Sequence, residues 1–133
     1  IIYDSTVLKL EEDGVVRFNM PEGSSPSRDI VWAKFTKNDE VIYAMVNHWP
    51  SRRGGAEKSE PKRMIAANAA KNFIDSLKNA DPNIQIVFMG DLNDHPEDKG
   101  PQLVNESLCA MIIFTKGRDS FVALSVTFPM IVP

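Results

Sequence analysis

The chain has 133 residues, enough for a single domain with its own hydrophobic core. Hydrophobic residues make up 43% and charged residues 25%, a balance that excludes a disordered chain. The formal net charge of −3 excludes an overall basic field of the kind that drives non-specific binding to nucleic acid. No apolar run approaches the roughly 20 residues of a membrane span, and the single cysteine, Cys109, leaves no partner for an intrachain disulfide.

The first half of the chain reads as short strands. Residues 7–10 and 15–18 are apolar, and Asp13-Gly14 between them predicts a hairpin turn. Residues 19–29 contain prolines, a glycine and serines and predict a surface loop. Two further strands are expected at residues 30–36 and 41–46, joined by a polar turn.

A helix is predicted over residues 61–78, followed by a strand at 84–89. Ser59 is the expected N-cap and Pro61 lies in the expected first turn. The apolar residues recur at spacings of three and four, in one stripe: Ala67, Ala70, Ile74 and Leu77. Strand, helix and strand over residues 41–89 form a β-α-β unit, which usually joins parallel strands.

The end of the chain is harder to assign. Residues 103–114 fit a helix or a strand equally well, and residues 121–132 resemble an apolar strand interrupted by Pro129. The chain opens without a methionine and closes on an apolar stretch, so we expect it to be a piece of a longer protein.

Two polar clusters follow the two strands of the β-α-β unit. NHWPSRRGG occupies residues 47–55, and GDLNDHP occupies residues 90–96. The carboxyl ends of parallel strands meet at one edge of a sheet, where α/β proteins bind their ligands. The two clusters therefore predict one site.

The NHWPSRRGG and GDLND segments, separated by a helix, resemble the endonuclease/exonuclease/phosphatase superfamily, whose fold is that of deoxyribonuclease I. The opening IIYDSTVLKL and Arg28 before IVWAKF are also similar to the family. The resemblance implies an α/β fold that is part of a four-layer α/β sandwich with mixed β-sheets. It covers about residues 1–101, with 102–133 divergent, so residues 1–133 are expected to be a single partial domain.

The resemblance implies a phosphoesterase that depends on Mg²⁺ or Mn²⁺. Asp91 matches the carboxylate that orients or deprotonates water and is a candidate metal ligand. Asn93 matches an amide that donates to the phosphate, and His48 matches an imidazole beside the scissile phosphate. Arg52, Arg53 and Tyr3 are the candidate substrate-binding residues.

The chain also departs from the family pattern. Members carry a metal-binding Glu on strands upstream of this segment and a Ser-Asp-His segment near their end. The histidines here are only His48 and His95, and no Asp-His pair follows residue 104. The resemblance therefore implies an incomplete catalytic site in this segment alone.

Other interpretations remain. Asp94 and His95 are expected to be turn residues, and Trp49 is expected to pack its loop. A calcium loop is excluded because Pro96 stands where that loop requires glycine. The alternative function is an inactive remnant, or a module that binds a phosphorylated ligand. The substrate class stays open among nucleic acid, inositol phosphate and sphingomyelin, and the sequence indicates neither a compartment nor an oligomer.

Overall fold

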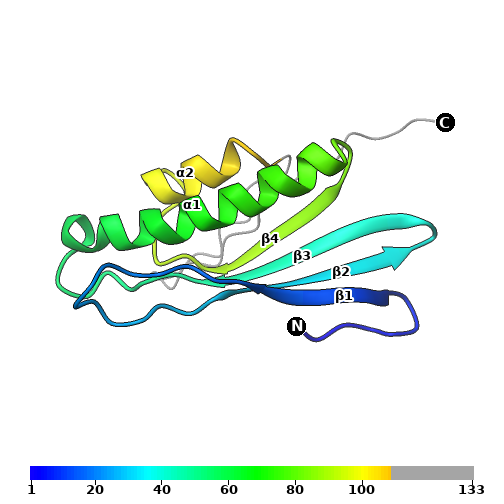
Figure 1. The fold of residues 1–133 in the computed structure, drawn as a ribbon, viewed down its shortest axis with the longest axis horizontal. Helices are drawn as coiled ribbons and strands as arrows, with labels where there is room; N and C mark the ends of the chain where they lie inside the picture. Colours follow the sequence, from blue (N-terminus) through cyan, green and yellow to red (C-terminus); the bar gives the residue numbers. More distant parts are fainter. Residues whose placement is uncertain (109–133) are drawn as a thin grey trace.

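The computed structural model of the chain describes residues 1–108, in which two helices lie over one face of a four-stranded sheet (Figure 1). The elements in chain order are β1 (Lys9–Val16), β2 (Ile30–Lys37), β3 (Glu40–His48), α1 (Ala56–Ala80), β4 (Gln85–Asp91) and α2 (Lys99–Asn105). The strands are hydrogen-bonded in that same order. β1 and β3 are both antiparallel to β2, whereas β4 is parallel to β3. The predicted α/β class with a mixed sheet is therefore confirmed. Predictions for residues 109–133, Cys109 and the strand at 121–132 included, lie outside the described residues.

The predicted hairpin at Asp13-Gly14 is wrong. These residues lie within β1, which runs without a turn from Lys9 to Val16 and pairs with β2. Gly14 is opposite Trp32, and a Cβ added to Gly14 would lie 2.9 Å from the indole ring. The glycine therefore makes room for a neighbouring side chain and does not turn the chain.

The turn predicted after β2 is confirmed. Asn38 and Asp39 join β2 to β3 and both have positive φ, 49° and 66°. Two successive left-handed residues match the twist of a two-residue hairpin, and Asn and Asp tolerate that conformation better than other side chains do. The loop predicted over residues 19–29 is also confirmed, since no helix or strand occurs there.

Helix α1 begins five residues earlier than the sequence predicts. Its N-cap is Gly55, and Ser59, the expected N-cap, lies inside the helix. The Ser59 hydroxyl donates to the carbonyl of Gly55 at 2.6 Å, and Arg63 Nη2 donates to the carbonyl of Ala56 at 2.8 Å. The backbone N–H of Ser59 also donates to the Gly55 carbonyl, so both side chains are bound to the part of the chain upstream of Pro61, where α1 begins.

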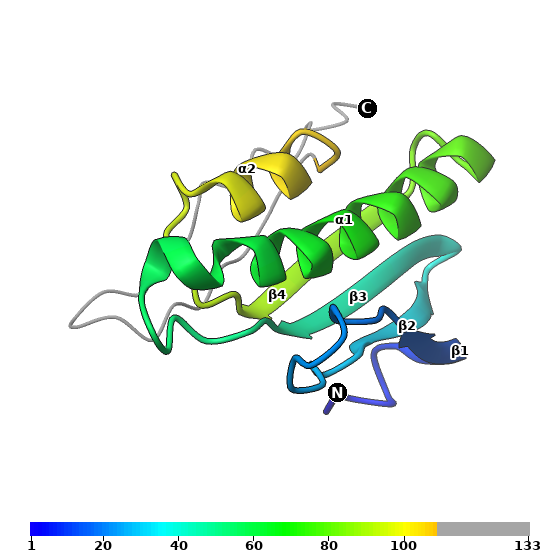
Figure 2. The ribbon, with the colours of Figure 1, turned by 60° about the vertical axis from the view of Figure 1, so that its left-hand side comes forward.

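The side chains of the sheet alternate between two faces. Ile30, Met45 and Phe88 point toward the helices and form the main core with buried residues of α1, among them Ala66, Ala70 and Ile74. Ala33, Phe35 and Ala44 point to the opposite face, where Leu8 from the N-terminal segment packs against them. Figure 2 shows α1 running along β3 and β4 on the first face.

The predicted crossover is confirmed, because α1 connects β3 to the parallel strand β4. The carboxyl ends of both strands therefore reach the same edge of the sheet, next to the beginning of α1 (Figure 1). Within residues 1–108 neither helix is both long enough and apolar enough to cross a membrane.

Candidate active site

His48 and Asp91 are the last residues of β3 and β4 and are register partners. Partners in a parallel sheet project to the same face about 5 Å apart at their Cα atoms. His48 is exposed and Asp91 is half-buried. The structure therefore brings an imidazole and a carboxylate together at the edge of the sheet that the two polar clusters predict.

Gly90 permits this arrangement. Its φ is 133°, and a Cβ at this position would lie 2.0 Å from the carbonyl oxygen of Asn47. A side chain at residue 90 would therefore push β3 and β4 apart next to His48 and Asp91.

Asn93 connects the two loops. Its φ of 53° is left-handed, a conformation that asparagine tolerates. Its backbone N–H donates to Asp91 Oδ1 at 3.0 Å, and its side-chain Nδ2 donates to the carbonyl of Trp49 at 2.9 Å. The Asp91 carboxylate is thereby oriented by its own loop, and that loop is attached to the residue after His48.

Two buried residues, Asn47 and Trp49, connect the ends of β3 and β4 by hydrogen bonds. Asn47 is 2% exposed; its Nδ2 donates to the carbonyl of Met89, and its Oδ1 accepts from Trp49 Nε1, both at 3.2 Å. The Trp49 backbone N–H donates to the carbonyl of Asp91 at 2.9 Å. Trp49 is 1% exposed, and its ring fills the space next to Gly100 of α2. The expectation that Trp49 packs its loop is confirmed.

The prediction that Asp94 is an ordinary turn residue is wrong. Asp94 is 3% exposed, and its Oδ1 accepts from Arg63 Nε of α1 at 2.5 Å and from Arg52 Nη2 at 3.4 Å. Arg63 is also buried and donates to Ser59 Oγ at 2.6 Å. Burial raises the pKa of Asp94, and the Arg63 guanidinium opposes that rise. This ion pair attaches the GDLND loop to the first turns of α1.

Arg52 joins the two predicted loops from the outside. Its Nε donates to the carbonyl of Asn93 at 2.9 Å, and its Nη2 pairs with Asp98. Asp98 also accepts from the backbone N–H of His95 at 2.7 Å. Arg52 thus contacts the loop that carries Asp91 and Asn93.

The remaining predicted residues lie in different places. Arg53 is exposed and lines the same pocket as His48. Tyr3 packs its ring on Phe35, with ring centroids 4.8 Å apart. Phe35 pairs with Ile42 of β3, six residues before His48, which corresponds to roughly 20 Å along the strand. The structure therefore does not bring Tyr3 to His48 and Asp91. His95 is exposed in its loop.

The sequence contains a pattern that indicates the Arg63–Asp94 pair, which the interpretation of Asp94 as a turn residue did not predict. Ser59 and Arg63 precede Ala67 by eight and four residues, so they extend the apolar stripe of α1 toward its N-terminus. A cation on a buried stripe requires a buried acidic partner. That partner is Asp94, 31 residues further along the chain.

Asp91 is the acidic side chain that stands next to His48 at this edge. Within residues 1–108 no three His, Cys, Asp or Glu side chains form a group suited to hold a metal ion. This part of the chain thus supplies a single carboxylate ligand, flanked by the amide of Asn93 and the imidazole of His48.

Comparisons with known proteins agree with this fold. The profile of the endonuclease/exonuclease/phosphatase family matches residues 1–128. The chain is similar to truncated TDP2 from Caenorhabditis elegans, with 18% identity, a TM-score of 0.56, and coverage of 69% of this chain and 34% of that one. It is similar to D. rerio TDP2 complexed with single-strand DNA product, with 18% identity, a TM-score of 0.51, and coverage of 76% and 36%. The chain spans about a third of the length of these structures. No curated protein sequence matches it.

Proposed function

The chain belongs to the endonuclease/exonuclease/phosphatase family, and on that premise we propose that it supplies part of the active site of a metal-dependent phosphoesterase. The observation that carries the proposal is the register pair of His48 and Asp91 at the carboxyl ends of two parallel strands. Asn93 adds an amide two residues later, attached both to Asp91 and to the loop of His48. A base, an amide donor and an imidazole at one edge are among the groups that stabilise the transition state of phosphoester hydrolysis.

In this proposal Asp91 orients the attacking water and accepts its proton. Asp91 Oδ1 already accepts the backbone N–H of Asn93, and within the described residues Oδ2 has no partner, which leaves it for the water. The water oxygen forms a bond to phosphorus as the bond to the leaving oxygen breaks, and the leaving oxygen takes a proton from solvent. His48 donates to a non-bridging oxygen, and the second N–H of the Asn93 amide donates to another, so both stabilise the charge that develops.

The donor set fits one side of a divalent metal site. Mg²⁺ is commonly held by one or two carboxylates, with waters and substrate phosphate completing its shell. Among residues 1–108, Asp91 is the residue that would hold Mg²⁺ or Mn²⁺. When bound, the metal would neutralise phosphate charge and lower the pKa of the attacking water. The family's metal-binding glutamate and its second catalytic histidine would come from other parts of the protein.

The substrate-binding roles are assigned by position. Arg53 is exposed beside His48 and is free of hydrogen bonds to the other described residues, so we assign it to the substrate phosphate. Arg52 remains a candidate phosphate ligand that also contacts the Asn93 loop. Tyr3 remains a prediction and would require a substrate that extends along the sheet. We take nucleic acid as the first substrate class to test, because D. rerio TDP2 is complexed with a single-strand DNA product.

The test is hydrolysis of a phosphoester panel by the full-length protein, with Mg²⁺ and with EDTA. The panel contains a thymidylate oligomer, bis(nitrophenyl) phosphate, an inositol phosphate and sphingomyelin. We expect EDTA to abolish activity, Asp91→Asn to lower kcat by about a thousandfold, and His48→Gln to lower it by about a hundredfold or more.

His95→Gln is the matched control, because His95 is an exposed histidine of the neighbouring loop whose side chain makes no hydrogen bond or ion pair with the described residues. We expect its kcat to stay within twofold of the parent. Activity that survives EDTA, or that is equal in the parent and Asp91→Asn, would overturn the proposal.

A second candidate function is a binding module that holds a phosphorylated ligand without hydrolysing it. The exposed Arg53 beside His48 favours it, because a guanidinium can hold a phosphate without a metal ion. The same panel separates the two functions, because a binding module would retain the thymidylate oligomer in an anisotropy assay while no substrate is turned over.

A further inference from the structure

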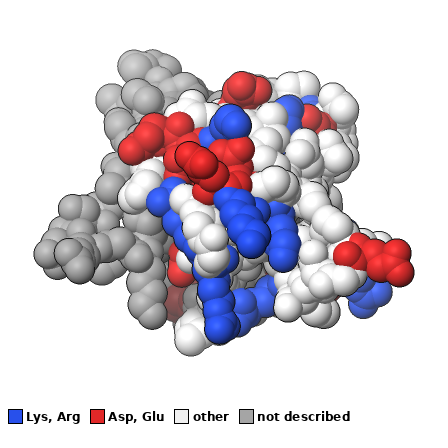
Figure 3. Space-filling view, turned by 90° about the vertical axis from the view of Figure 1, so that its left-hand side faces the viewer, with Lys and Arg blue, Asp and Glu red and all other residues white. Residues whose placement is uncertain are grey.

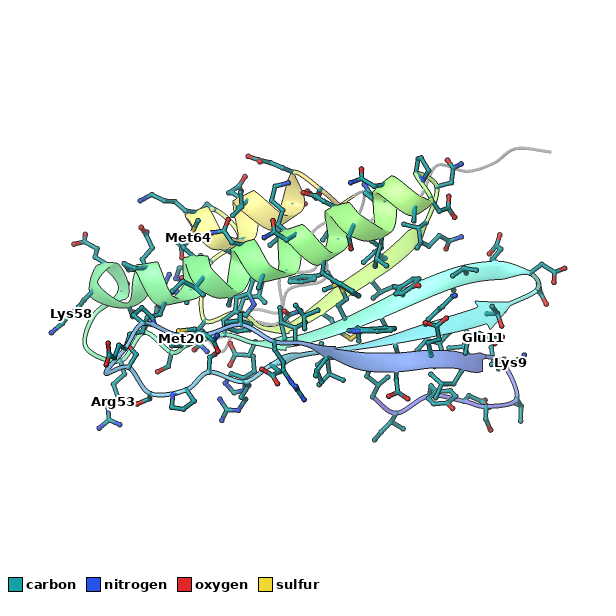
Figure 4. All side chains as sticks on the ribbon, in the orientation of Figure 1. Lys9, Glu11, Met20, Arg53, Lys58 and Met64 are labelled. Atoms are coloured by element: carbon teal, nitrogen blue, oxygen red, sulfur yellow. The ribbon has the colours of Figure 1, made fainter. Side chains whose placement is uncertain are left out.

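A pocket of about 460 Å³ opens beside His48. Its walls come from the loop before β2, from the loop after His48 and from the first turns of α1. Its volume lies within the range of small-molecule sites. Figure 4 labels three of its residues, Met20, Arg53 and Lys58, at the end of the molecule where α1 begins.

The pocket is strongly cationic. Four of its lining residues are Arg28, Arg53, Lys58 and Lys62, and none of the lining residues is Asp or Glu. The first N–H groups of α1 add a partial positive charge at the same place, since the N-cap is Gly55 and no side chain caps this end. Figure 3 shows lysine and arginine side chains gathered on this end of the molecule.

These four cations differ from the other cations of the described residues. Lys9, Arg17, Lys34, Arg52, Arg63, Lys71 and Lys99 each pair with a carboxylate. Within residues 1–108, the side chain of Lys37 is the only other cationic side chain, besides those of the four pocket residues, that makes no ion pair or hydrogen bond. The charges left without a partner are therefore concentrated in one concave place beside a candidate catalytic histidine.

We propose that this pocket holds a second phosphate of the substrate, next to the phosphate that is cleaved. The inference rests on the proposed function and extends it, because it requires a substrate with at least two phosphates. A second phosphate would neutralise the unpaired charges, and His48 would lie between the two phosphates as a shared wall. A substrate whose group beside the scissile phosphate is cationic, such as a choline ester, would be repelled.

The second phosphate has two possible sources, a neighbouring linkage of a polynucleotide strand or another phosphate of a polyphosphorylated small molecule. The experiment uses the full-length protein with Mg²⁺ and three substrates: a thymidylate oligomer, inositol hexakisphosphate, and bis(nitrophenyl) phosphate, which has one phosphate. The test variant is Lys58→Gln/Lys62→Gln, whose side chains lie one turn apart on α1. Arg28→Gln is a second test variant on a separate element.

The matched control is Lys9→Gln/Lys37→Gln, which removes the same charge at the opposite end of β1 and β2. We expect the test variants to lower kcat/KM by about tenfold for a substrate with several phosphates and to leave bis(nitrophenyl) phosphate within twofold. The control should change neither. The source of the second phosphate is identified by the substrate, oligomer or inositol hexakisphosphate, for which kcat/KM falls by about tenfold in the test variants.

Equal losses on all substrates, or no loss on any, would overturn the inference. A parent protein that hydrolyses none of the three substrates removes the proposed function but not the pocket. In that case fluorescence anisotropy of a labelled thymidylate oligomer decides: affinity about tenfold weaker in Lys58→Gln/Lys62→Gln than in the control supports the second-phosphate site, and equal affinity removes it.

Discussion

Gly90 sets the spacing of the two strands on which His48 and Asp91 stand. Replacing it with alanine would place a methyl group within 2.0 Å of the Asn47 carbonyl at a φ of 133°. We expect Gly90→Ala to lower the free energy of unfolding by at least about 3 kcal/mol, because the clash is with backbone and strand pairing must break to relieve it. The measurement is urea unfolding followed by circular dichroism.

Gly23→Ala is the control for that substitution. Gly23 also has a positive φ, 76°, but nothing lies within 4 Å of an added Cβ. The free energy of unfolding of Gly23→Ala should fall by about 1 kcal/mol, which is the cost of the left-handed conformation alone. Equal losses in the two variants would show that the close approach to Asn47 does not matter.

The Arg63–Asp94 pair gives a second expectation for single residues. Both side chains are 2% exposed, so Asp94→Asn leaves a buried guanidinium without its counter-charge. We expect a loss of roughly 3–5 kcal/mol in the free energy of unfolding. The exposed pair of Glu60 and Lys99 is the comparison, and Glu60→Gln should cost less than about 1 kcal/mol.

A rescue variant separates loss of charge balance from loss of packing. Arg63→Met/Asp94→Leu removes both charges and keeps apolar volume, so it should recover much of the stability lost in Asp94→Asn. An Asp94→Asn protein as stable as the parent in urea unfolding would mean that the pair does not hold the GDLND loop to α1.

At the scale of elements, α2 is attached to α1 through Asp75. The Asp75 carboxylate accepts from Lys71 Nζ at 2.8 Å and from Ser107 Oγ, just beyond α2, at 2.7 Å. These two hydrogen bonds hold the pKa of Asp75 below its ordinary value of 3.8. A lowered carboxyl pKa contributes stability that is complete above the unfolded value and is lost as the pH falls through the folded value.

Asp75→Asn should therefore be less stable than the parent at pH 7, by about 0.5–1 kcal/mol given the half-exposed side chain. The difference should shrink below about pH 5 and vanish once the carboxyl of the parent is protonated in the fold. Asp13→Asn on β1 is the control, since the Asp13 carboxylate makes no hydrogen bond or ion pair with the described residues. Thermal unfolding from pH 3 to pH 7 measures both, and a difference independent of pH would contradict the assigned role.

The same elements mark the limit of what the sequence could predict. The apolar stripe at Ala67, Ala70 and Ile74 has the helical period and predicted α1, because that signal is local. The start of α1 was predicted too late because Ser59, a typical N-cap residue, lies inside the helix, where its hydroxyl accepts from Arg63, which pairs with a carboxylate 31 residues away. Asp13-Gly14 was misread as a turn because the space at Gly14 is filled by Trp32 of another strand. In each case a contact between distant segments overrode the local pattern.

For the site, the position of the two loops could be predicted, but the hydrogen bonds and ion pairs that connect them could not. Parallel strands bring their carboxyl ends to one edge, so His48 and Asp91 follow from the β-α-β unit alone. Asn47, Asp94 and Arg63 were missed because polar residues in a loop look like solvated turn formers until a partner buries them.

The whole molecule combines a negative net charge with a cationic end. The net charge of −3 alone predicts repulsion of an anionic substrate, so association should become faster as salt screens the repulsion. The pocket formed with Arg28, Arg53, Lys58 and Lys62 predicts the reverse, because ions released from a bound phosphate strand make binding weaker in salt. The sign of the salt dependence therefore shows whether the net charge or the cationic pocket dominates substrate binding.

We expect kcat/KM for a thymidylate oligomer to fall as NaCl is raised from 50 to 300 mM, with a log–log slope of about −0.7 for each phosphate that is held. In Lys58→Gln/Lys62→Gln the slope should become shallower by about one such contact, because the strand then releases fewer ions. Lys9→Gln/Lys37→Gln, with the same change in net charge, should keep the slope of the parent. A rate that rises with salt in the parent would mean that the net charge dominates and that the cations beside His48 do not hold the strand.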